Sequence, residues 1–327
     1  MSHILDIVRY QIYRTKYRYG RKLPLSIPVD VSLELASLCN MSCQYCYHAS
    51  QETLPFKKGI MAWDTAKKIL DEAAINGVNS IKTNFRGESS INPNFERITE
   101  YAKSWHNKLG GSVFIDRLSN TNFKFRSDRE DIFRGFSNQT KVKISYDSFD
   151  KKVFETQRAG GDHELTTRNI DIFYNHPSRI HSGTRMVIQA VRTQLNKDED
   201  IAGQAKVRWP DATISIRDMV AGRVENKEVG ELEHKKRDVS GRAPCLQAFV
   251  RLMFHWDGKA GICCPDISGE LIVGDIKNQS LKQIFNSPKA KTVRKKLKDL
   301  SAFKDYSACK NCSSFESYKG FKPVWDS

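Results

Sequence analysis

Eight cysteines are the residues of this sequence best suited to metal or redox chemistry. Three of them, Cys39, Cys43 and Cys46, lie close together in the spacing CxxxCxxC. A closed zinc site takes four protein ligands, and His48 is the only nearby candidate for a fourth. A cubane iron–sulfur cluster normally takes four thiolates. Three thiolates would leave one iron open, so the spacing predicts a 4Fe–4S cluster with room for a ligand that is not protein.

Five more cysteines lie in the last third of the chain. Cys309 and Cys312 form a CxxC pair far downstream of the other three. Four cysteines at such spacings suit a structural zinc ion or an iron–sulfur cluster, since both accept thiolates. Either metal would explain how a short segment with few large apolar residues folds. The remaining three are Cys245, Cys263 and Cys264.

The segments that must position these cysteines are predicted to be strands alternating with helices. Apolar residues at three- to four-residue spacing predict helices over residues 63–73, 95–105 and 165–173. Such alternation indicates βαβ units and a parallel sheet. Six units are too few for an eight-unit barrel, so we expect an α/β fold with a partial (β/α)6 TIM-like barrel. The six β-like runs are residues 29–35, 78–85, 112–116, 142–146, 186–191 and 213–216.

The loops that follow barrel strands build the active site in parallel barrels. We therefore expect the chemistry at residues 36–48, 86–90, 117–122, 147–158, 192–196 and 217–222.

The composition suggests four parts. A basic N-terminal arm spans 1–27, the barrel 28–222, a charged linker 223–242, and a small α+β domain 243–327. Within the last part, Asp257-Gly258 is predicted to turn a hairpin between 249–256 and 259–264, and a lysine-rich helix is predicted over 280–300.

Charge and hydropathy limit the partners. The net charge of +15 favours anionic ligands or partners. Four tyrosines interleave with bases in the arm, which would suit nucleic acid or a membrane surface; a solvated helix that packs its tyrosines on the barrel is the favoured interpretation. No window approaches 18 apolar residues, and no signal-peptide core is present. We therefore expect a cytoplasmic protein with no membrane partner, whose thiols are reduced.

The cysteine motif after the first strand, with Tyr45 before its last cysteine, resembles the radical S-adenosylmethionine (radical SAM) superfamily. This resemblance implies that S-adenosyl-L-methionine binds the open iron of the Cys39/Cys43/Cys46 cluster. It also implies reductive cleavage to a 5′-deoxyadenosyl radical that takes hydrogen from a substrate, and a reducing donor such as flavodoxin or ferredoxin.

The same resemblance suggests cofactor-binding residues. Gly87 and Glu88, in Asn84-Phe85-Arg86-Gly87-Glu88-Ser89, stand where the family has Gly-Gly-Glu-Pro, which holds the methionine ammonium; Arg86 and Ser89 depart from that pattern. Ser145, with Asp147 second, is the candidate for the ribose. Arg158 is the candidate for the cofactor carboxylate, which arginine can bind in bidentate fashion.

The C-terminal cysteines resemble the twitch domain, the shortened form of the SPASM extension. The resemblance implies one auxiliary 4Fe–4S cluster, with Cys264 spare, although Cys263 and Cys264 could exchange roles. Zinc is the alternative metal. The implied ligands are Cys245, Cys263, Cys309 and Cys312.

These features predict a radical SAM enzyme. The first hypothesis is net oxidation of a sugar or aminocyclitol-like small molecule through the auxiliary cluster. The alternatives are a peptide or protein side-chain maturase, a nucleic-acid-modifying enzyme and a non-catalytic metal-stapled binding protein. Nothing in the sequence selects a catalytic base.

Overall fold

The computed structural model describes residues 2–46, 57–108, 110–218, 244–264, 266, 269–310 and 312. Within them, one sheet of nine strands has the order β6-β5-β4-β3-β2-β1-β7-β8-β9. The first six strands pair in parallel with their neighbours in chain order. They are β1 (Asp30–Leu33), β2 (Ser80–Lys82), β3 (Asp116–Thr121), β4 (Lys141–Ser145), β5 (Arg185–Arg192) and β6 (Thr213–Asp218).

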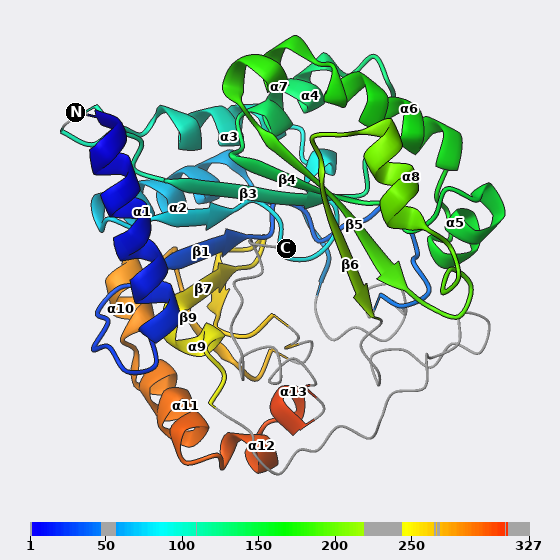
Figure 1. Cartoon of the computed structure of the whole chain (residues 1–327). Coiled ribbons are helices and arrows are strands. Elements are labelled where there is room, and N and C mark those ends of the chain that lie inside the picture. Colours follow the sequence, from blue (N-terminus) through cyan, green and yellow to red (C-terminus); the bar gives the residue numbers. More distant parts are fainter. Residues whose placement is uncertain are drawn as a thin grey trace.

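Helices lie along the outer side of these strands (Figure 1). Apolar strand residues such as Val31, Ile81 and Ile144 are fully buried and belong to the main hydrophobic core. Because side chains alternate across a strand, the residues between them face the inner, concave side. The helices are α2 (Trp63–Ile75), α3 (Phe95–Ser104), α4 (Glu130–Ser137), α5 (Lys151–Gln157), α6 (His163–Tyr174), α7 (Pro177–Ser182) and α8 (Ile201–Arg208).

The C-terminal segment continues the barrel sheet. Strand β7 (Arg251–Phe254) pairs in parallel with β1, and β8 (Lys259–Gly261) returns antiparallel to β7 about the predicted turn at Gly258. Strand β9 (Ile272–Asp275) closes this edge. The helices of this segment are α9 (Gln247–Val250), α10 (Leu281–Phe285), α11 (Pro288–Lys298), α12 (Ala302–Asp305) and α13 (Ser307–Lys310).

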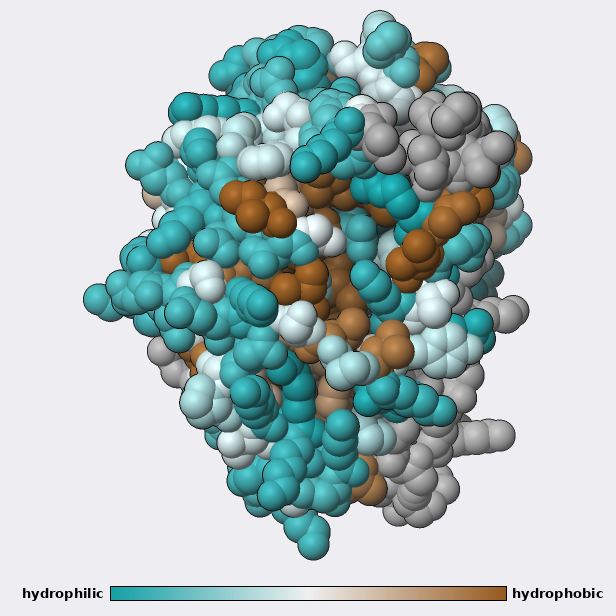
Figure 2. Space-filling view, turned by 90° about the vertical axis from the view of Figure 1, so that its left-hand side faces the viewer, coloured by the Kyte–Doolittle hydropathy of each residue, from teal (hydrophilic) through white to brown (hydrophobic). Residues whose placement is uncertain are grey.

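The N-terminal arm is the helix α1 (Ser2–Tyr19). Tyr13 and Tyr17 are buried in the core, and the Arg9 guanidinium donates to the Ser112 carbonyl at 2.8 Å. The favoured interpretation of the arm, a helix that packs tyrosines on the barrel, is therefore confirmed. On the face that carries α1, a few apolar side chains lie among mostly hydrophilic ones (Figure 2).

Two predicted elements differ most from the observed ones. The third strand occupies 116–121, not 112–116, so residues 117–121 are strand and not the predicted loop. Before it, the Val113 amide is bound to the Trp105 carbonyl. The predicted helix over 280–300 is two helices. Pro288 begins the second, and the Ser287 hydroxyl caps it by accepting from the Ala290 amide at 3.2 Å.

The four-part division of the chain stays a prediction. Its linker, 223–242, and residues 313–327 lie outside the described part of the chain. Among the described helices, none combines the length and apolarity that crossing a bilayer requires.

Candidate functional site

The predicted cluster loop follows β1 at the carboxyl edge of the sheet. Cys39, Cys43 and Cys46 are all partly exposed there. The segment 157–160 lies beside this loop, and the two are joined by backbone hydrogen bonds. The Ser42 amide donates to the Ala159 carbonyl at 2.7 Å, and the Gln44 amide donates to the Gln157 carbonyl at 2.9 Å. The loop after β1 and the end of α5 are therefore one unit.

Gly87 brings the loop after β2 against the same cysteine loop. Its φ is +65°, and a Cβ there would lie 2.2 Å from the Ala36 carbonyl oxygen and 2.5 Å from that of Leu38. The Glu88 amide donates to the Leu38 carbonyl at 2.8 Å. Only glycine permits both this backbone conformation and so close an approach, which gives Gly87 a role in placing Cys39.

Glu88 is almost fully buried beside this contact. Its carboxylate accepts from the Asn122 amide at 2.8 Å and from the Ser90 amide at 3.1 Å. Burial raises the pKa of Glu88, and these hydrogen bonds act in the opposite direction. The Asn122 side chain also reaches Asn40 at 2.6 Å. The end of β3 thus joins Glu88 to the cysteine loop.

Asp147 and Arg158 come together under the cysteine motif. The carboxylate of Asp147 is fully buried and lies 2.9 and 3.0 Å from two guanidinium nitrogens of Arg158. The Val191 amide and the Tyr45 hydroxyl also donate to Asp147. The Nη1 of Arg158 lies 3.7 Å from the sulfur of Cys43. Asp147 therefore fixes Arg158 against the motif.

Ser145, the first candidate for the ribose, lies two residues before Asp147. It ends β4 on the inner face, half-buried and in register with Gln189 of β5. Asp147 already holds three donors, so Ser145 stays the better candidate of the two.

The thiols of the motif suit a cluster by their chemistry. Burial raises the pKa of Cys39 to about 12, and nearby Glu88 raises it further in the same direction. Burial raises the pKa of Cys43 to about 11, whereas Arg158 favours its thiolate. Thiolate ligands must be deprotonated, so a cationic cluster core would stabilise the thiolate form that burial disfavours.

The C-terminal cysteines also lie near one another. Burial raises the pKa of Cys263 well above its usual range, with further contributions from Cys264, Cys245 and Cys309. Burial raises the pKa of Cys245 to about 12, and Cys312 contributes. The predicted auxiliary ligands and the spare Cys264 therefore belong to one neighbourhood, and none of the eight cysteines, all described, is in a disulfide.

Across the described residues, no group of three or more His, Cys, Asp or Glu side chains is arranged to hold a metal ion. A cubane takes one thiolate on each iron, so its ligands surround a cluster and do not meet at a single point. The two cysteine sets fit such clusters by donor type and number.

One buried network was missed by the sequence reasoning. Arg86, which departs from the family pattern, lies 2.9 Å from Glu34 in a salt bridge that is almost completely buried. His255, just after β7, contacts both residues. Burial alone would raise the pKa of Glu34, but the hydrogen bond to His255 and the charge of Arg86 bring it below its ordinary value. Arg86 therefore joins the loop after β2 to the C-terminal segment.

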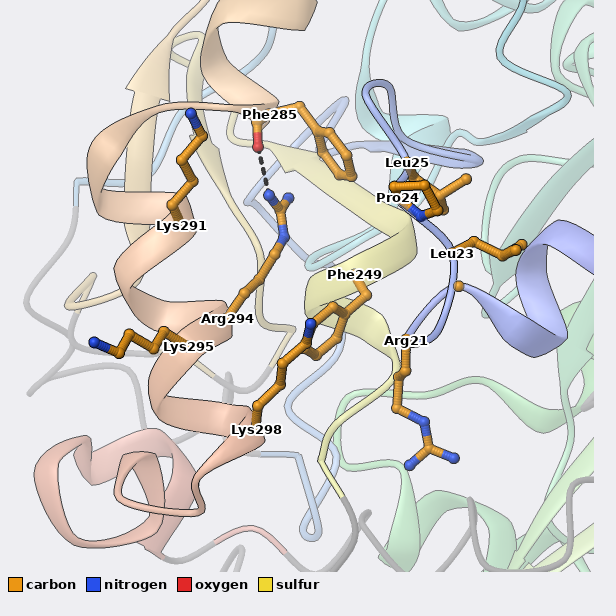
Figure 3. Close-up of a pocket in the computed structure, with 11 residues that line it drawn as sticks. Arg21, Leu23, Pro24, Leu25, Phe249, Phe285, Lys291, Arg294, Lys295 and Lys298 are labelled. Carbon is orange, nitrogen blue, oxygen red and sulfur yellow. Dashed lines mark hydrogen bonds between the residues drawn. The ribbon is translucent and has the colours of Figure 1, made fainter.

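A basic pocket of about 340 Å³ lies elsewhere, between α11 and residues 20–25 (Figure 3). Arg294 donates to the carbonyls of Ala248 and Phe285 at 2.8 and 2.7 Å. Arg21 donates to the Pro244 carbonyl at 2.9 Å, next to Cys245. No cysteine lines this basic pocket, but Arg21 joins it to the residue before Cys245.

Comparison with known families gives one match. Residues 245–313 match the SPASM family, an iron–sulfur cluster-binding domain. The match confirms the predicted cluster domain, and its range contains Cys245, Cys263, Cys309 and Cys312. No curated protein sequence gives a significant match.

Solved structures are similar over most of the chain. BtrN in complex with AdoMet and 2-DOIA has a TM-score of 0.57 at 16% identity, covering 90% of this chain and 97% of that one. Native anSMEcpe with AdoMet and the Cp18Cys peptide gives 0.57 at 15%, covering 89% and 88%. Streptococcus suis SuiB bound to precursor peptide SuiA gives 0.55 at 13%, covering 83% and 67%. The comparisons confirm the predicted α/β partial barrel and, at the level of the fold, its resemblance to radical SAM enzymes.

Proposed function

We propose that this chain is a radical SAM enzyme that oxidises a small polar substrate, such as a sugar or aminocyclitol, with an auxiliary 4Fe–4S cluster as electron acceptor. The observation that carries the proposal is the cysteine loop at the carboxyl edge of a partial barrel. Two buried networks, one through Glu88 and one through Asp147 and Arg158, hold that loop. The match to an iron–sulfur domain over 245–313 supports the second cluster.

When bound, a cluster with an open iron would coordinate S-adenosylmethionine and would supply the electron for its reductive cleavage to methionine and a 5′-deoxyadenosyl radical. Cys39, Cys43 and Cys46 would hold that cluster. Glu88 would accept from the methionine ammonium, and Ser145 would bind the ribose. Arg158, fixed by Asp147, would place its remaining N–H groups beside Cys43, where the cofactor carboxylate is expected.

The auxiliary cluster would be held by Cys245, Cys263, Cys309 and Cys312. A reducing protein such as flavodoxin or ferredoxin would supply electrons, and the net positive charge of the chain suits an acidic donor.

A peptide maturase is the second candidate. It is supported by the similarity to SuiB and anSMEcpe, whose structures hold peptides. Nucleic-acid modification has less support, because Tyr13 and Tyr17 of the basic arm are buried and are not available to stack on bases.

The test is reductive cleavage of S-adenosylmethionine by anaerobically reconstituted protein. We expect about eight irons per chain, about four for each cluster, and release of 5′-deoxyadenosine with dithionite. Cys43→Ala should abolish that release, and Cys264→Ala, the matched cysteine control, should keep both the iron content and the release. Cleavage that survives Cys43→Ala would contradict the proposal, and about four irons with one zinc would remove the auxiliary redox role.

A further inference from the structure

Asn122 is a buried residue that follows directly on strand β3 and connects two loops of the site. Its backbone amide donates to the Glu88 carboxylate at 2.8 Å. The next residue, Phe123, has a φ of +56°, which is rare for a bulky side chain. Such a strained conformation persists only where the surrounding contacts fix it. The chain therefore turns sharply, at a fixed place, immediately after Asn122.

The contacts that fix this turn come from the helices of the barrel. The Phe123 ring is fully buried, and the ring centroids of Phe136 in α4 and Phe173 in α6 lie 5.1 and 5.3 Å from its own. The side-chain amide of Asn169, also in α6, donates to the Phe123 carbonyl at 2.9 Å. The position of Asn122 thus depends on the barrel and not on the cysteine loop alone.

The side-chain amide of Asn122 faces the cysteine loop. Its oxygen accepts from the Lys124 backbone amide at 2.9 Å, which identifies the other end of the group as the nitrogen. That nitrogen donates to the Asn40 side-chain oxygen at 2.6 Å and lies 3.9 Å from the sulfur of Cys39. An amide nitrogen carries two hydrogens. One is donated to Asn40, and the second is available to the sulfur of Cys39.

Two cysteines of the motif have a side-chain N–H donor beside the sulfur. The guanidinium of Arg158 lies 3.7 Å from the sulfur of Cys43 and supplies a positive charge there. Next to Cys39 the corresponding donor is uncharged, the amide of Asn122, and the Met41 backbone amide is a second donor. The donors to Cys39 and Cys43 therefore differ in charge and come from different elements, the end of β3 and the end of α5.

We propose that Asn122 is a positioning residue that donates a hydrogen bond to the Cys39 thiolate of the bound cluster and raises the reduction potential of that cluster. Hydrogen bonds to the sulfurs are one of the features that set the potential of an iron–sulfur cluster. Reduction adds negative charge that spreads to the sulfurs, so a donor stabilises the reduced cluster more than the oxidised one. The inference deepens the proposed function, on which it rests for the cluster at Cys39.

The test is a redox titration of anaerobically reconstituted protein, followed by electron paramagnetic resonance. The signal of the motif cluster is the one that Cys43→Ala removes, and the auxiliary cluster serves as an internal reference. Asn122→Ala removes the donor. At a fixed potential, we expect the ratio of reduced to oxidised motif cluster to fall at least about tenfold, or about 59 mV for a one-electron couple. The auxiliary cluster should titrate as in wild type.

Two further variants separate donation to the sulfur from support of the loop. Asn122→Asp has nearly the same shape and keeps an acceptor for the Lys124 amide, but it replaces the donor with a negative charge. Its motif potential should fall at least as far as in Asn122→Ala. The matched control, Asn40→Ala, removes the 2.6 Å contact with Asn122 and leaves the N–H that faces Cys39. Its motif cluster should titrate as in wild type.

The possible outcomes are distinguishable. An unchanged potential in both Asn122 variants, or an equal shift in Asn40→Ala, would overturn the inference. Loss of about four irons per chain from both Asn122 variants would also overturn it, because Asn122 would then only build the site. A wild-type chain with no cluster at the motif would overturn the inference and the proposed function together. Both clusters without release of 5′-deoxyadenosine would contradict the proposed function alone, because the comparison of potentials does not depend on that release.

Discussion

The buried pair of Asp147 and Arg158 is the strongest single support of the cysteine motif. Arg158 contacts Asp147 through two nitrogens and faces Cys43. Breaking a buried ion pair by removing one partner leaves an uncompensated charge, which costs about 3–5 kcal/mol. We therefore expect Asp147→Asn to lower the free energy of unfolding by about 3 kcal/mol in urea denaturation and to reduce the iron bound by the motif.

The matched control is the exposed pair of Arg126 and Asp128 on the surface, whose closest atoms are 2.6 Å apart. Solvent screens such a pair, so Asp128→Asn should leave the unfolding midpoint unchanged. Equal midpoints for the two variants would show that the pair at Asp147 is not a structural support.

Lys143 provides a pH-dependent prediction. Burial, then Arg217, Lys82 and Lys141, lower its pKa to about 7, while Asp116 acts in the opposite direction. Between pH 7 and the pKa of a lysine in the unfolded chain, the unfolded state binds more protons than the folded state. Stability must therefore rise with pH in that window. We expect the free energy of unfolding of wild type, relative to Lys143→Met, to rise from pH 7 to 8.5 by up to about 1.4 kcal/mol per unit. A difference that is flat or falls with pH would contradict this assignment.

At the scale of elements, the packing of the loop after β2 against the cysteine loop after β1 depends on Gly87. Gly87 and Gly183 have nearly the same φ, +65° and +66°, but a Cβ at Gly183 meets nothing within 4 Å. Gly183→Ala should thus cost only the strain of the backbone, about 1 kcal/mol. Gly87→Ala also forces a methyl group against the Ala36 and Leu38 carbonyls. We expect it to cost clearly more in thermal denaturation and to lower the iron content of the motif. Similar losses for both alanine variants would count against this loop contact.

Some strands and helices could be predicted from the sequence, and others could not. Strands β1 and β5 were predicted from β-like runs of apolar residues, and in β1 these residues alternate with polar ones. The third strand was displaced, since the apolar run at Val113 precedes it and its own residues are polar except for Leu118. The helix over 280–300 was predicted as one because its lysine-rich periodicity hid the break at Ser287 and Pro288.

In the site, the cysteine motif could be predicted from its short-range spacing in the sequence. The contacts of Arg158 with Cys43 and of Arg86 with His255 could not, because folding brings together residues 115 and 169 positions apart.

On the scale of the whole molecule, the continuous sheet makes the C-terminal segment part of the barrel. Strand β7 pairs with β1, the strand that precedes the cysteine motif. Asp30 with Arg251, and Glu34 with Arg86 and His255, cross the same joint. The proposed auxiliary cluster would thus be held by a segment whose position relative to the motif is fixed by backbone hydrogen bonds and by two buried ionic networks.

The net charge of +15 leads to a prediction about electron transfer. An acidic donor should be attracted over a long range, and salt should screen the attraction. We expect the rate of reduction of the reconstituted protein by flavodoxin, followed by stopped-flow absorbance, to fall at least about tenfold between about 0.01 M and 0.5 M salt. Arg21 joins the basic pocket to the residue before Cys245, so reversing the charges of Lys291 and Lys295 to Glu should slow the reaction most. Lys152 and Lys197, exposed on the barrel, give a control variant with the same change in net charge. If that control slows reduction equally, net charge alone and not the basic pocket directs the donor; a rate independent of salt would contradict electrostatic attraction altogether.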